Sequence, residues 1–186
     1  MPLRPAHLGF VRHYNLYFES KGVYTSFMTK LIEKFDKAAI DFLKKIAFPF
    51  ARISLFIVFF WFGLLKIINA SPANPLVEQL LNKTLHFIEF SLFLVILGIL
   101  EMIIGITFLI PKAERLTIFL LIPHMITTFM PLVFLPNVTW QSFLIPTLEG
   151  QYIIKNLVII ALAFSIASGL SPLRFDNKKI NEVKLL

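Results

Sequence analysis

This chain contains four long runs of hydrophobic residues, which are separated by more polar segments. The runs cover residues 50–69, 87–110, 116–135 and 152–171. A helix rises about 1.5 Å per residue, so roughly 20 apolar residues are needed to cross the hydrocarbon core of a bilayer. The pattern therefore predicts an all-α integral membrane protein, a four-helix bundle. Pro123 and Pro131 interrupt the third run.

A different pattern precedes the first run. Within residues 26–48, hydrophobic residues recur at spacings of three and four, and lysine and aspartate residues mostly fill the other face. The recurring positions are Phe27, Leu31, Phe35, Ala38, Phe42 and Ile46. This amphipathic pattern is typical of an interfacial helix, so we expect it to lie on the cytoplasmic leaflet. Pro49 is expected to mark a bend into the first span.

The remaining segments are more polar. We expect an irregular arm over residues 1–24, which contain no long apolar run. Residues 71–85 are expected to form a loop with a short helix, residues 111–115 a tight turn, and residues 136–151 a second loop. The chain then has three parts: a cytoplasmic arm and amphipathic surface helix (1–49), the four-transmembrane-helix bundle (50–171) and a basic cytoplasmic tail (172–186).

The distribution of basic residues orients the predicted bundle. The arm, the surface helix, the 111–115 turn and the tail are basic, whereas the two other loops carry only Lys83. Lys and Arg are enriched in cytoplasmic loops, so both termini are expected in the cytoplasm and the protein in the cell (inner) membrane. The net charge of +7 does not indicate nucleic acid as a partner, because basic residues here end apolar runs instead of covering a soluble face. The expected partner is the lipid bilayer.

Composition and missing motifs exclude several classes of protein and of functional site. Hydrophobic residues make up 57% of the chain and charged residues 16%, which is too apolar for a soluble domain. The chain has no Cys, which excludes disulfide relays, iron–sulfur clusters and a cysteine nucleophile. Phosphate-binding, dinucleotide-binding and zinc-protease motifs are also absent. No metal site and no cofactor are evident, and we expect no stand-alone enzymatic activity.

Ionisable residues inside the predicted spans form the candidate site. Each costs about 2.5–3.5 kcal/mol at mid-helix on insertion scales, so such residues are commonly functional. The candidates for a buried polar cluster or ligand-binding site are Lys66, Glu89, Glu101, His124 and Lys155. Counting along the helices places Lys66, Glu89 and Lys155 at one level near the outer surface, where opposite charges would pair. The alternative is that both lysines snorkel to the outer headgroups.

By the same count, Glu101 and His124 are expected deeper in the bilayer than these three residues, at depths similar to each other. Gly98, Glu101 and Gly105 share one helical face, and Gly63 marks a face of the first span. Glycines let helices approach closely, so we expect all three to be helix contacts and Glu101 to face the interior. A Glu–His pair at mid-depth could carry a proton or hold the polar head of a ligand. The alternative is a buried hydrogen bond that fixes helix register.

Three short motifs occur in the first, second and fourth spans. They are the W-x-G-x-x-K pattern of Trp61–Lys66, preceded by Arg52, the G-x-x-E-x-x-x-G pattern of Gly98–Gly105, and the G-x-x-x-x-K-[DN] pattern of Gly150–Asn156. In order and spacing they resemble the DoxX-like superfamily, most closely its YkgB/RclC branch of bacterial inner-membrane proteins. The resemblance covers about residues 50–170. The third span fits loosely, so no role for His124 follows from the family.

The resemblance implies a four-helix membrane bundle with a non-enzymatic role in oxidative, reactive-chlorine or envelope stress. It also suggests a lipid-like or quinone-like molecule bound between the helices. Two alternatives remain open. One is a quinone-interacting membrane subunit of an oxidoreductase complex with a membrane or soluble partner, and the other is a small-molecule transporter. A homo-oligomer is compatible with each.

Overall fold

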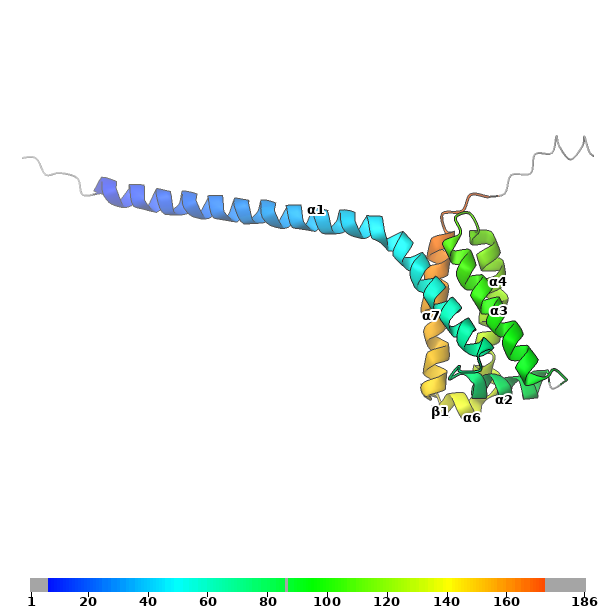
Figure 1. The fold of residues 1–186 in the computed structure, drawn as a ribbon. Coiled ribbons are helices and arrows are strands. Elements are labelled where there is room, and N and C mark those ends of the chain that lie inside the picture. Colours follow the sequence, from blue (N-terminus) through cyan, green and yellow to red (C-terminus); the bar gives the residue numbers. More distant parts are fainter. Residues whose placement is uncertain (1–6, 86, 173–186) are drawn as a thin grey trace, which may run out of the picture. The chain divides into compact units, whose positions relative to one another are not determined.

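The computed structural model describes residues 7–85 and 87–172, and it describes side chains from residue 28 onward (Figure 1). The predicted basic tail lies outside the described residues from residue 173 onward. Contacts divide the chain into a first unit, residues 1–48, and a second unit, residues 49–186.

The described part of the chain is almost entirely helical. Its elements are α1 (His7–Ile67), α2 (Asn74–Thr84), α3 (Phe90–Leu109), α4 (Glu114–Phe129), α5 (Pro131–Phe134), α6 (Pro136–Thr139), β1 (Trp140–Ser142), β2 (Ile145–Pro146) and α7 (Leu148–Ala167). Four helical stretches are long and apolar enough to cross a membrane, as expected of a multi-pass membrane protein. These are Met28–Ile67, Phe90–Leu109, Glu114–Phe134 and Leu148–Ala167.

The first unit consists of the N-terminal part of α1. The helix expected over residues 26–48 is confirmed, but the irregular arm is wrong from His7 onward, because α1 already begins there. No proline occurs between Pro5 and Pro49, so nothing in this stretch removes a backbone donor and ends the helix. Pro49 lies inside α1 and does not end it.

The second unit packs α3, α4, α7 and the C-terminal part of α1 around one core. Each long helix contributes buried hydrophobic side chains. They are Ala51, Leu55 and Phe59 from α1, Ile104 and Phe108 from α3, Leu121 and Met125 from α4, and Ala163 and Ile166 from α7. Their spacings of three and four place them on one face of each helix. Large hydrophobic side chains such as Ile57, Phe119 and Val158 remain exposed on the outside, as lipid contact requires.

The expected glycine contacts are confirmed between α1 and α3. A Cβ atom built on Gly63 would lie 2.5 Å from the carbonyl oxygen of Gly98, and one built on Gly98 would lie 2.6 Å from that of Gly63. A Cβ atom on Gly105 would lie 3.0 Å from the backbone nitrogen of Phe60. These pairs run in opposite directions along the two helices, so α1 and α3 are antiparallel. Only glycine allows their backbones to approach this closely.

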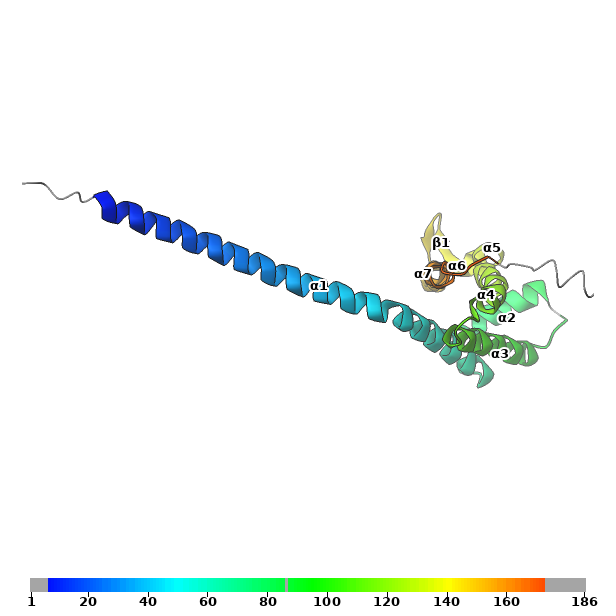
Figure 2. The same cartoon turned by 90° about the horizontal axis from the view of Figure 1, so that it is seen from above.

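The two longer connections carry secondary structure. The short helix expected within residues 71–85 is confirmed as α2, and a turn joins α3 to α4 as expected. The second connection differs from a simple loop, because it forms α6 and an antiparallel pair of strands, β1 and β2. The indole Nε1 of Trp140 donates to the carbonyl oxygen of Leu132 at 2.9 Å and ties β1 to the preceding segment. Figures 1 and 2 together show β1 beside the N-terminal end of α7, and β2 connects the two elements in the sequence.

Candidate functional site

An ion pair joins α1 to α3 next to their glycine contact. The Nζ of Lys66 lies 2.6 Å from the Oε2 of Glu101, and each side chain is 8% exposed. Both residues are candidates from the sequence, but counting along the helices pairs Lys66 with Glu89. That pairing is wrong, because Lys66 pairs with Glu101.

The direction of the helical side chains explains this pairing. A side chain on a helix points toward the N-terminus of that helix. Because α1 and α3 are antiparallel, Lys66 leans back toward Gly63 and Glu101 leans back toward Gly98, and these glycines face each other. The two charged groups therefore converge, although their Cα atoms belong to different levels. Because the glycines have no side chains, α1 and α3 lie close enough for the two charged groups to meet.

His124 on α4 adds a third group to the cluster. Its Nε2 lies 3.4 Å from the Oε1 of Glu101, and its side chain is 6% exposed. The two carboxylate oxygens thus face partners on two different helices. The expectation that Glu101 and His124 lie together is confirmed. We call Lys66, Glu101 and His124 the mid-span cluster.

The second ring nitrogen of His124 has a different environment. Its Nδ1 is buried and has no hydrogen-bond partner among the described residues. The ring packs edge-on against the ring of Phe59, with 5.8 Å between the centroids. The hydroxyls of Thr127 and Thr128 donate to the backbone carbonyl of His124 and not to its ring. The Nε2 of the imidazole thus faces Glu101, while Nδ1 keeps its capacity for a hydrogen bond.

Two of the sequence candidates do not join the cluster. Glu89 is exposed and immediately precedes α3 with extended backbone, so its side chain is outside the helix. Lys155 is exposed on α7, and its Nζ lies 5.0 Å from the centroid of the Tyr152 ring. Their expected burial is wrong. An exposed lysine that follows a tyrosine by one turn fits the snorkelling alternative, because the long apolar stem can carry the ammonium toward the headgroups.

A second ion pair was missed by sequence reasoning. The guanidinium of Arg52 on α1 pairs with the carboxylate of Glu114 in the first turn of α4. Its Nη1 also donates to the carbonyl oxygen of Phe108 at 2.9 Å, near the C-terminus of α3. The last carbonyls of a helix lack intrahelical donors, and an acidic group is favourable at a helix N-terminus. The signal was available, because Arg52 and Glu114 both lie at the predicted inner ends of spans.

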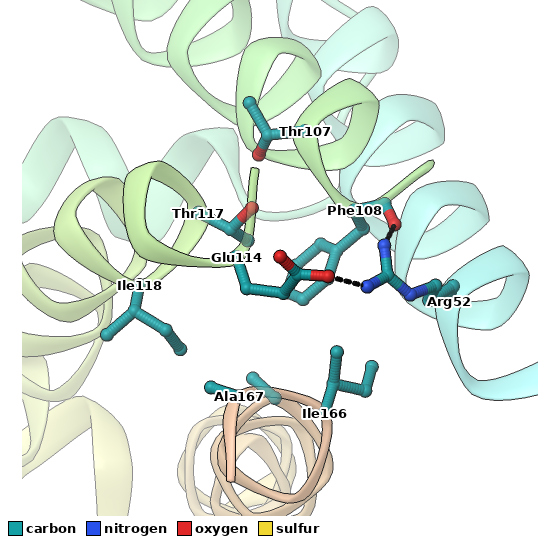
Figure 3. A pocket seen from close by; sticks show the side chains of 9 residues that line it. Arg52, Thr107, Phe108, Glu114, Thr117, Ile118, Ile166 and Ala167 are labelled. Carbon is teal, nitrogen blue, oxygen red and sulfur yellow. Dashed lines mark hydrogen bonds and ion pairs between the residues drawn. The ribbon is translucent and has the colours of Figure 1, made fainter. Parts of the chain in front are cut away.

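The Arg52–Glu114 pair borders a shallow pocket (Figure 3). Two threonines and residues of α7 complete its wall. The lining is Arg52, Thr107, Phe108, Glu114, Thr117, Ile118, Ala163, Ile166 and Ala167. The stacked rings of Phe59 and Phe108, with centroids 6.0 Å apart, lie between this pair and the mid-span cluster. The two polar sites are therefore separated by a hydrophobic layer.

Comparison of this chain with models of protein families, with curated proteins and with solved structures found no match. The resemblance to the DoxX-like superfamily thus rests on the motif residues. Four of these, Gly63, Lys66, Gly98 and Glu101, meet at the contact between α1 and α3. The motif lysine of the fourth span, Lys155, is exposed and has no place in this contact.

Proposed function

We propose that the protein is a DoxX-like inner-membrane protein that binds the polar head of a lipid-like or quinone-like molecule at Glu101 and His124. In this proposal it is a four-helix bundle with both termini in the cytoplasm. Its role is non-enzymatic and lies in oxidative, reactive-chlorine or envelope stress, as the family resemblance implies. The observation that supports ligand binding is the buried Nδ1 of His124, which has no hydrogen-bond partner among the described residues.

The chemistry of the imidazole indicates what the ligand must offer. In a neutral imidazole one nitrogen donates a hydrogen bond and the other accepts one. The Nε2 of His124 faces the Oε1 of Glu101 at 3.4 Å, so in this proposal the imidazole proton lies on Nε2 and Nδ1 is an acceptor. A hydroxyl group, as on a hydroquinone or a lipid headgroup, can donate to it. A buried polar atom without a partner costs about 1–3 kcal/mol, so a ligand that supplies this bond gains affinity.

The ionic character of the cluster also favours binding over a purely structural role. Hydrophobic residues of similar volume often stabilise a protein as well as a buried ion pair does. Ionisable groups within spans commonly mark sites for substrates, ions or protons. A buried ion pair inside a span therefore supports a use for the charge beyond helix packing.

The test is to identify what the protein retains from its native membrane. The wild type, His124→Phe and Lys155→Met are purified in native membrane discs, and bound lipids and quinones are measured by mass spectrometry. Lys155→Met is the matched control, because Lys155 is exposed. We expect one lipid or quinone class to be enriched in the wild type and the control, and about tenfold less in His124→Phe, as for the loss of one buried hydrogen bond.

Identical lipid and quinone contents in the three preparations would contradict the proposal. Enrichment of a quinone together with an oxidoreductase chain would instead favour the alternative of a quinone-interacting subunit.

A further inference from the structure

The part of α1 within the first unit segregates its side chains by polarity. Its large hydrophobic residues are exposed, with Ile32 at 62%, Phe35 at 69% and Phe42 at 60%. Successive residues of a helix are rotated by about 100°, which places these three with Met28, Leu43 and Ile46 on one face about 100° wide. An exposed apolar face of this kind marks a surface that contacts a membrane or another protein.

The opposite face is charged and mostly basic. Residues 28–48 contain five lysines and three acidic residues, for a net charge of five minus three, or +2. The lysines are Lys30, Lys34, Lys37, Lys44 and Lys45. By the same rotation, Lys34 and Lys45 lie along one border of the apolar face, and Lys37 lies opposite its centre. Lysines at the border can extend toward phosphates while the apolar face is buried.

This stretch cannot itself cross the bilayer. The apolar helix from Met28 to Ile67 has 40 residues, which corresponds to about 60 Å, or twice the thickness of the hydrocarbon core. Residues 50–67, with two charged residues, are sufficient for the crossing, whereas residues 28–48 contain eight. The charged stretch is nonetheless joined directly to a span at Pro49, so the chain holds it near the membrane surface.

We propose that residues 28–48 form a helix that binds anionic lipid in the leaflet where the first span begins. Phe35 and Phe42 insert into the boundary of the acyl chains, and Lys34 and Lys45 contact lipid phosphates. A basic polar face combined with an aromatic apolar face is the combination that binds anionic membrane surfaces. Pro49 lacks the backbone donor to the carbonyl of Lys45, which lets the helix axis change direction there. This surface acts independently of the mid-span cluster.

Single cysteines in the full-length protein test this proposal, because the chain contains no Cys. Phe42→Cys and Lys37→Cys are each labelled with an environment-sensitive fluorophore. Each is reconstituted into nanodiscs of phosphatidylcholine with or without phosphatidylglycerol. With phosphatidylglycerol, the label at position 42 should shift to the blue and be quenched by brominated acyl chains. The label at position 37 should show neither effect.

The contribution of charge is tested in the Phe42→Cys background. Replacing both Lys34 and Lys45 with Glu should reduce quenching by brominated lipid at least fivefold, because each basic residue near an anionic surface contributes about a factor of five. Lys37→Glu in the same background is the matched control and should have less effect. The melting temperature of each variant shows that the second unit remains folded.

Three results would overturn the proposal. The first is equal quenching at positions 42 and 37. The second is equal quenching in discs with and without phosphatidylglycerol. The third is efficient disulfide formation between copies at position 42 without lipid quenching, which would identify a second copy of the chain as the occupant of the face.

Discussion

The Nζ of Lys66 lies 2.6 Å from the Oε2 of Glu101, although 35 positions separate the two residues in the chain. The pair sits beside the point where the backbones of α1 and α3 touch, at Gly63 and Gly98. Both side chains are only 8% exposed, so each charge is compensated mainly by the other.

The first prediction concerns this coupling. Glu101→Gln leaves the ammonium of Lys66 buried without its partner, which should destabilise the protein by about 3–5 kcal/mol. The double variant Lys66→Met with Glu101→Gln should be more stable than Glu101→Gln alone, because no uncompensated charge remains. A double-mutant cycle read from thermal unfolding in detergent measures the coupling.

Lys155→Met serves as the control for this cycle, because the lysine is exposed and its change should add independently to Glu101→Gln. A coupling energy near zero between Lys66 and Glu101 would show that the ion pair contributes nothing to stability.

The second prediction concerns the glycine contact. A methyl group at position 63 would lie 2.5 Å from the carbonyl oxygen of Gly98, so Gly63→Ala must push α1 and α3 apart. We expect a loss of about 1–3 kcal/mol, as for overpacking elsewhere. Gly169→Ala is the matched control, because no atom lies within 4 Å of its added methyl group. Equal melting temperatures for the two variants would contradict the close contact.

The third prediction concerns the two contacts of the Arg52 guanidinium. One guanidinium nitrogen pairs with Glu114 and the other donates to the carbonyl oxygen of Phe108. A lysine at this position has a single ammonium and cannot reproduce the planar fork. Stability should therefore decrease from the wild type to Arg52→Lys and again to Arg52→Met, measured by resistance to thermal unfolding.

Lys112→Met, an exposed change in the turn between α3 and α4, should leave the melting temperature almost unchanged. If Arg52→Lys melts at the wild-type temperature, the planar guanidinium is not needed to join Glu114 to Phe108.

The fourth prediction concerns topology. The alternation of basic and non-basic loops predicts both termini in the cytoplasm, with the hairpin of β1 and β2 on the other side. In intact cells an impermeant thiol reagent should label Phe143→Cys, which is 89% exposed in the wild type. The same reagent should label Lys37→Cys only after permeabilisation. The reverse labelling pattern would invert the orientation.

The parts of this site that depend on spacing within a single helix could be predicted from the sequence. Glu101 and His124 could be paired from sequence, because helical rise relates residue number to depth and both residues lie near mid-span. Gly63, Gly98 and Gly105 could be identified as contacts, because small residues within apolar runs have few other uses. Both inferences depend on the spacing of residues along one helix.

The other relationships depend on which helices are neighbours and how each is rotated. Counting placed Lys66 at the level of Glu89, but an antiparallel partner and a long flexible stem let it reach Glu101. Hydropathy did not distinguish the exposed Lys155 from a buried one, because both environments in a membrane protein are apolar. The helix before residue 26 was also missed, because its hydrophobic pattern is weak. The absence of proline between His7 and Thr25 was the signal that a helix could continue there.

The sequence by itself determined that the chain has four apolar helices of membrane-spanning length, which residues allow helices to touch, and that Glu101 and His124 lie at one depth. These properties follow from composition and from periodicity within single helices. Only the tertiary structure decided that Lys66 joins Glu101, that Arg52 joins Glu114, and that Glu89 and Lys155 stay outside. Ion pairs form between side chains of different helices, and their partners are set by the register and rotation in which the helices pack.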